Sequence, residues 1–158
     1  MNNNIQIISI VALSFLLTSC GFKKISQINT NIIYIQNIKI SGEERFSSTM
    51  KNNILLISNI ASENKYDAEI KIKKHKTNKI KDKAGTTTRY NLSISAKLKL
   101  INIDSKEIIQ KTFVRNNDYM VGTTHSITIS NEINTTKIIM QQLSDSINQF
   151  ITLSMRNT

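Results

Sequence analysis

The sequence predicts an α+β fold, a two-layer sandwich with a four-stranded, largely antiparallel sheet and two helices on one face, in the order β-α-β-β-β-α. Two observations lead to this prediction. Apolar and polar residues alternate at period two through the middle of the chain, which is typical of half-buried strands. Two other segments place apolar residues three and four positions apart, which is typical of helices with one buried face.

The first two elements follow an N-terminal apolar run. Residues 32–40 (IIYIQNIKI) are rich in β-branched residues and predict a strand. Ser41, with Glu44 three residues later, has the spacing of a helix capping box. The helix that follows is expected to bury one face over four turns, formed by Phe46, Met50, Ile54, Ile57 and Ala61.

Three strands and a closing helix complete the prediction. The second strand buries alternate residues from Tyr66 to Ile72, and a lysine-rich turn over residues 74–87 leads to the third. The third strand is expected to face the helices with Tyr90, Leu92, Ile94, Ala96, Leu98 and Leu100. Residues 104–106 form a turn, and residues 108–114 return as the fourth strand. A polar loop through Gly122 leads to a long helix that buries Ile133, Met140, Leu143, Ile147 and Phe150 or Ile151 and ends near Met155.

The N-terminal segment resembles a lipoprotein signal. Residues 5–17 are almost wholly apolar, and about 20 such residues are needed to span a bilayer as a helix. Leu17-Thr18-Ser19-Cys20 reads as a lipobox, in which the chain is cut before the cysteine and its thiol is acylated. The alternative is a buried cysteine in an ordinary apolar strand. The expected organisation is a signal peptide over 1–19, a lipidated tether over 20–31 and a single domain over 32–158.

The compartment follows from the same segment. Two or more acyl chains give stable anchoring where one does not. Gly21 follows Cys20, whereas many inner-membrane lipoproteins carry Asp there, so the prediction is the outer membrane, lipid-anchored on its periplasmic side. Cys20 is the one cysteine of the chain, so no intramolecular disulfide is possible.

The chain is basic, with 21 Lys and Arg against 11 Asp and Glu and a formal net charge of +10. Such an excess favours polyanionic partners such as anionic lipid or lipopolysaccharide. Export and the absence of a nucleic-acid-binding motif argue against nucleic acid. Codon bias in an AT-rich genome is the alternative source of about half of the excess, since Ile, Asn and Lys dominate the composition.

No pattern in the sequence predicts catalysis. His75 and His125 stand far apart and beside no acid or cysteine, and both are expected in solvated loops. Nucleophile-elbow, P-loop and zinc-protease motifs do not occur. The expectation is a protein that is not an enzyme and has no cofactor or metal.

One polar cluster stands out, with seven lysines in thirteen residues. It could bind phosphates, because lysine acts toward them as a mobile point charge. Alternatively, it is a solvated hairpin tip whose lysines discourage edge-to-edge pairing. The candidate lipopolysaccharide-binding residues are Lys73, Lys74, Lys76, Lys79, Lys81, Lys83 and Arg89, with Lys71 at the start of the cluster.

With the lipobox and the element order, the chain resembles LptE, the lipopolysaccharide-assembly lipoprotein, in its alphaproteobacterial form. The residues that carry the resemblance are Cys20-Gly21-Phe22-Lys23, the strand opening Thr88-Arg89-Tyr90-Asn91-Leu92, the strand-loop Tyr119 and the long closing helix. After Phe22 the family usually continues with a basic residue and Pro-Leu-Tyr, whereas this chain has Lys24-Ile25-Ser26 after Lys23.

The resemblance implies a domain lodged inside an LptD-like outer-membrane β-barrel, the lipopolysaccharide translocon. There it would plug the barrel, assist its assembly and contact lipopolysaccharide. The alternatives are an accessory lipoprotein of an ABC-type lipid transport system and, from another class, an exported hydrolase.

Overall fold

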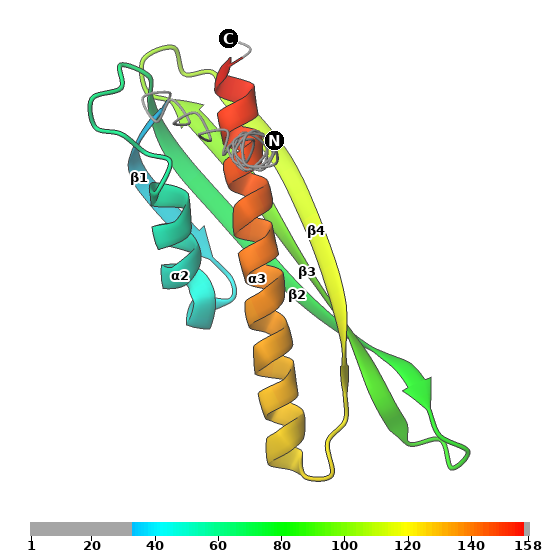
Figure 1. Ribbon diagram of the computed structural model, residues 1–158. Helices are drawn as coiled ribbons and strands as arrows, with labels where there is room; N and C mark the ends of the chain where they lie inside the picture. Colours follow the sequence, from blue (N-terminus) through cyan, green and yellow to red (C-terminus); the bar gives the residue numbers. More distant parts are fainter. Residues whose placement is uncertain (1–32, 157–158) are drawn as a thin grey trace, which may run out of the picture.

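The fold is known from a computed structural model, which describes residues 33–156. The elements are β1 (Tyr34–Ser41), α2 (Glu44–Leu55), β2 (Lys65–Lys81), β3 (Thr87–Asn102), β4 (Ile108–Met120) and α3 (His125–Arg156). The strands form a four-stranded sheet in the order β1-β2-β3-β4, and both helices lie against the same face (Figure 1). The predicted two-layer α+β fold is therefore confirmed.

The core lies between the sheet and the helices, with β3 at its centre. The period-two prediction for β3 is correct: Leu92, Ile94, Ala96, Leu98 and Leu100 are fully buried, and Tyr90 is half-buried. The helices contribute Met50, Ile54, Ile139, Met140, Leu143, Ile147 and Ile151. Each such side chain contributes roughly 1.5–3 kcal/mol when it is removed from water.

The sheet has one parallel pair, β1 with β2, because α2 carries the chain back between them. Gly42 explains why β1 ends where it does. Its φ of +112° turns the chain out of the strand, and a Cβ at this position would lie 2.1 Å from the carbonyl oxygen of Ile72. Beyond Lys71, β2 therefore continues without a partner on this edge among the described residues.

The predicted capping box is wrong. Ser41 is the last residue of β1, and the N-cap of α2 is Glu43, which makes no side-chain capping bond. The helix is also shorter than predicted, so Ile57 and Ala61 follow it. The reason is that the segment after α2 is held by β1, where Ser58 Oγ accepts a hydrogen bond from the Ile35 N–H.

The predicted lysine-rich turn over residues 74–87 is also wrong. Most of it is strand, since β2 runs to Lys81 and β3 begins at Thr87. The turn spans Asp82–Thr86, and the Asp82 carboxylate accepts hydrogen bonds from the N–H groups of Ala84 and Thr86. Residues 73–81 are exposed, so they show no apolar alternation, and backbone pairing with β3 keeps them extended. The ends of β2 and β3 project beyond the helical layer as a hairpin (Figure 1).

β4 is longer than predicted, α3 ends at Arg156, close to the predicted end near Met155, and two loop assignments change. β4 runs to Met120, so Tyr119 lies within a strand, and the polar residues after Val114 are held there by pairing with β3. His75 lies in β2 and His125 begins α3, so neither is a loop residue, although both are exposed.

Candidate functional site

The predicted lysine cluster lies along β2 and its turn, and the strand divides it between the two faces of the sheet. Lys74 and Lys76 share the face of the buried Ile72 and point toward the helices. Lys71, Lys73 and Lys79 point to the opposite face, which no described helix covers. The structure therefore separates residues that the sequence places in one cluster.

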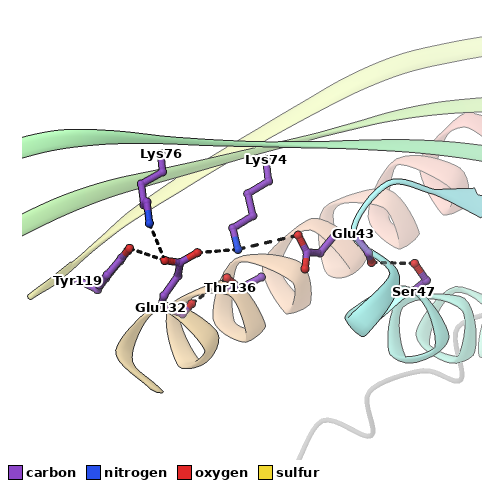
Figure 2. Close-up of polar contacts among 7 residues, drawn as sticks. All are labelled: Glu43, Ser47, Lys74, Lys76, Tyr119, Glu132 and Thr136. Atoms are coloured by element: carbon purple, nitrogen blue, oxygen red, sulfur yellow. Dashed lines mark hydrogen bonds and ion pairs between the residues drawn. The ribbon is translucent and has the colours of Figure 1, made fainter. Parts of the chain in front are cut away.

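On the helix side, Glu132 of α3 joins two of these lysines (Figure 2). Its Oε1 lies 2.9 Å from Lys74 Nζ, and its Oε2 lies 3.0 Å from Lys76 Nζ. The Tyr119 hydroxyl of β4 donates a 2.7 Å hydrogen bond to the same Oε2. One carboxylate thus ties α3 to both β2 and β4.

Lys74 also lies 3.9 Å from the carboxylate of Glu43 at the start of α2 (Figure 2). The side chains of Lys74 and Glu132 are 28% and 23% exposed, so this network lies partly beneath the surface. Such charge-assisted contacts are stronger than fully exposed ion pairs. The network therefore fixes the N-terminal half of α3 against the sheet where the apolar core ends.

The surroundings shift the pKa of Glu132 and the pKa of Tyr119 in opposite directions. Burial alone would raise the pKa of Glu132, but hydrogen bonds from Tyr119, Lys74 and Lys76 outweigh it and lower the value from 4.5 to about 2. Burial, followed by the hydrogen bond to Glu132, raises the pKa of Tyr119 well above 10.0. Glu132 is therefore a carboxylate and Tyr119 a neutral donor throughout the physiological range.

Two tyrosines complete this cluster. The rings of Tyr90 and Tyr119 stack with centroids 5.4 Å apart, and Lys76 Nζ lies 4.9 Å from the centroid of Tyr90. Because Lys76 is held by both a carboxylate and a ring, its charge is largely compensated within the chain.

On the opposite face, Asp118 of β4 pairs with a third lysine of the cluster. Lys79 forms an ion pair with Asp118 Oδ2, and Asn91 donates a 2.8 Å hydrogen bond to Oδ1. The bonds from Asn91 and Lys79, together with the nearby Arg89 charge, lower the pKa of Asp118. Of the proposed lipopolysaccharide-binding residues, four form no ion pair within residues 33–156: Lys73, Lys81, Lys83 and Arg89.

Sequence reasoning did not single out Glu132, although a signal was present. Glu132 lies four residues before the buried Thr136 and seven before the buried Ile139, so it continues the buried stripe of α3. An acid on such a stripe requires a compensating partner, and the partners here are two lysines from a distant strand. A groove of about 730 Å³ between α2 and α3, lined by Phe46, Met50 and Ile138 among others, was also not predicted.

Two further kinds of functional feature are absent from the described residues, a metal-binding cluster and a membrane-spanning helix. No group of His, Cys, Asp and Glu within residues 33–156 could hold a metal ion, and no helix there is long and apolar enough to cross a membrane. Cys20 and the rest of the lipobox lie outside the described residues.

The fold has counterparts among solved structures. The chain has an α+β sandwich of the kind found in solved structures of bacterial lipoproteins. It superposes on rare lipoprotein B from Shewanella oneidensis with a TM-score of 0.58 and 14% identity, covering 77% of this chain and 97% of that one.

A second structure, a protein from Caulobacter crescentus provisionally described as a lipoprotein, gives a TM-score of 0.54 with 8% identity over 77% of this chain and 92% of that one. No family model matches the sequence, and no curated protein matches it. At these identities the likeness establishes a shared fold.

Proposed function

We propose that this chain is an outer-membrane lipoprotein, anchored through Cys20 on the periplasmic side, that plugs and helps assemble an LptD-like β-barrel and contacts lipopolysaccharide. The observation that carries the proposal is a fold shared with rare lipoprotein B over nearly that protein's whole length, in a chain that also has a lipobox. The proposed role is not catalytic and uses no cofactor or metal.

The surface of the domain supports a role inside a polar lumen. The sheet face away from the helices carries lysine, serine and asparagine side chains at alternate positions of β2 and β3. The end of the long β2–β3 hairpin diverges from α3, so its tip lies away from both helices and is open to a partner (Figure 1).

Co-purification tests the barrel partner. The full-length chain carrying a C-terminal tag is extracted from membranes in mild detergent, captured, and its associated proteins are identified by mass spectrometry. The expected result is an outer-membrane β-barrel in near-equal amount. Recovery of an inner-membrane ABC transporter instead would replace the proposal with the alternative role in lipid transport.

The structure also sharpens the test of lipopolysaccharide contact by the hairpin. Lys74, Lys76 and Lys79 are engaged by Glu132 and Asp118, so the cations available at the tip are Lys81 and Lys83. We expect Lys81→Gln with Lys83→Gln to weaken binding of lipopolysaccharide several-fold at low salt, because each exposed charge contributes roughly 0.2–1 kcal/mol.

The matched control is Lys51→Gln with Lys137→Gln, which removes the same charge from exposed positions on α2 and α3. Binding is measured by co-sedimentation with lipopolysaccharide aggregates at two salt concentrations. Equal losses in the two double variants would show that net charge alone governs the contact and that the hairpin has no special part in it.

A further inference from the structure

The sheet face away from the helices carries a depression of about 320 Å³, lined by residues of all four strands. Strand pairing places its polar lining on two rungs of the sheet that share this face, and Ile70 lines the depression from the rung between them. One rung holds Ser41, Lys71 and Lys97, and the other holds Lys39, Glu69, Lys99 and Gln110. We call these seven residues the rung pocket.

The charge of the rung pocket is poorly compensated. Lys71 and Lys97 are directly opposite each other on β2 and β3, an arrangement that destabilises a sheet when the charges are alike. Four lysines against one glutamate leave a local formal charge of +3. A bound anion would remove this repulsion.

The one acid of the pocket is only loosely engaged. Glu69 Oε2 lies 3.7 Å from Lys99 Nζ, and the Glu69 side chain is 54% exposed. This differs from Glu132, whose two oxygens lie within 3.0 Å of two lysines. Lys39, Lys71 and Lys97 form no ion pair within residues 33–156, so their ammonium groups are available to a ligand.

We propose that the rung pocket binds a phosphate-bearing anion. Lysine ammonium groups supply charge and three rotatable N–H donors each, while the Ser41 hydroxyl and Gln110 amide add neutral donors. The volume of about 320 Å³ is at the lower end of the range for small-molecule sites, about 300–1,000 Å³. The phosphate can belong to a soluble molecule or to a lipid headgroup. The inference rests on the rung pocket and not on the proposed function.

The test uses inorganic pyrophosphate and the full-length chain in neutral detergent at low salt, with affinity measured by titration calorimetry. Lys71→Gln with Lys97→Gln removes the facing pair, and Lys51→Gln with Lys137→Gln is the charge-matched control. We expect the pocket pair to weaken binding about tenfold and the control pair less than about twofold. Glu69→Gln is expected to tighten binding, because it removes the one negative charge of the pocket.

Thermal melting gives an independent readout and shows whether the variants fold. A ligand that binds the native state raises Tm. Pyrophosphate should therefore raise the Tm of the wild type and control, but not that of the pocket pair, which should itself remain folded. Equal weakening in both pairs, or no saturable binding to the wild type, would overturn the proposal.

A second arm distinguishes the sources of the phosphate. Binding to neutral-lipid vesicles with and without phosphatidic acid is measured by flotation for the same variants, each also carrying Cys20→Ala so that the proposed acyl anchor does not itself hold the chain on the vesicles. If the pocket pair loses vesicle binding as well as pyrophosphate binding, the ligand is a lipid headgroup. If it loses pyrophosphate binding alone, the ligand is a soluble phosphate. Both outcomes support a phosphate site, and neither depends on whether a barrel partner is found.

Discussion

At the scale of single residues, the central feature is that one carboxylate organises several basic groups. The Glu132 carboxylate contacts the ammonium groups of Lys74 and Lys76 and accepts a hydrogen bond from the Tyr119 hydroxyl. The two lysines lie in β2 and the tyrosine in β4, the strands on either side of β3. Because the contacts are partly buried, removing Glu132 leaves Lys76 without an acidic partner among the described residues and leaves Lys74 only the more distant Glu43, at 3.9 Å. The polar network therefore contributes to stability by holding α3 against the sheet.

Glu132→Gln is expected to lower the free energy of unfolding by about 1–2 kcal/mol at pH 7, measured by chemical denaturation. The pKa of Glu132 is lower in the folded chain, about 2 against an ordinary 4.5. Its stabilisation is therefore complete above pH 4.5 and is lost as the pH falls toward 2. The difference between wild type and variant should shrink over that window.

The control for this prediction is Glu63→Gln, an exposed carboxylate that forms no ion pair within residues 33–156. It should change stability little at either pH. A loss for Glu132→Gln that stays constant from pH 7 to pH 3 would contradict the assigned role of its charge.

At the scale of elements, the short length of β1 leaves the second half of β2 exposed at the edge of the sheet. β1 covers β2 as far as Lys71, and the remaining ten residues of β2 pair with β3 alone. Gly42 sets this limit, since its backbone conformation and its approach to Ile72 O both require the absence of a side chain. Gly42 thus sets where β1 stops pairing with β2 and where the edge of β2 becomes exposed.

Gly42→Ala is expected to destabilise the chain by about 2–4 kcal/mol, from the strained φ together with a backbone contact that must be relieved. Gly85→Ala is the matched control, because Gly85 also has a positive φ, +84°, but its Cβ would meet no atom within 4 Å. It should cost about 1–2 kcal/mol. Equal losses, measured by denaturation, would show that the contact with Ile72 is unimportant.

At the scale of the whole molecule, charge is distributed unevenly between compensated and uncompensated sites. Lys74, Lys76 and Lys79 are paired with acids, whereas Lys39, Lys71 and Lys97 of the rung pocket and Lys81 and Lys83 at the tip form no ion pair among the described residues. A chain with a net charge of +10 will also adhere to anionic membranes without a lipid anchor. Tests of anchoring must therefore separate adhesion from insertion.

Cys20→Ala is expected to move the protein from the membrane fraction to the soluble fraction after a wash at high salt, which screens electrostatic adhesion. Ser26→Ala, outside the lipobox, should leave the protein in the membrane fraction. Mass spectrometry of the wild type should show a lipid-modified peptide that begins at Cys20. A Cys20→Ala chain that resists the high-salt wash would contradict the proposed anchor.

The sequence by itself determined the layer architecture and most of the core, because burial imposes a period on apolar residues. The alternation from Tyr90 to Leu100 and the helical spacing of Met140, Leu143 and Ile147 correctly predict which side chains are buried. Where a strand is exposed on both faces, as in residues 73–81, that periodic signal vanishes, and the prediction of a turn was wrong.

Only the tertiary structure decided which charges compensate one another. Lys76 and Glu132 are 56 positions apart, and nothing in local sequence links them. Lys71 and Lys97 likewise face each other through strand register, which the alternation of each strand alone does not specify. Electrostatic contacts depend on distance in space, so the division of the lysines into paired and free groups required the relative placement of β2, β3, β4 and α3.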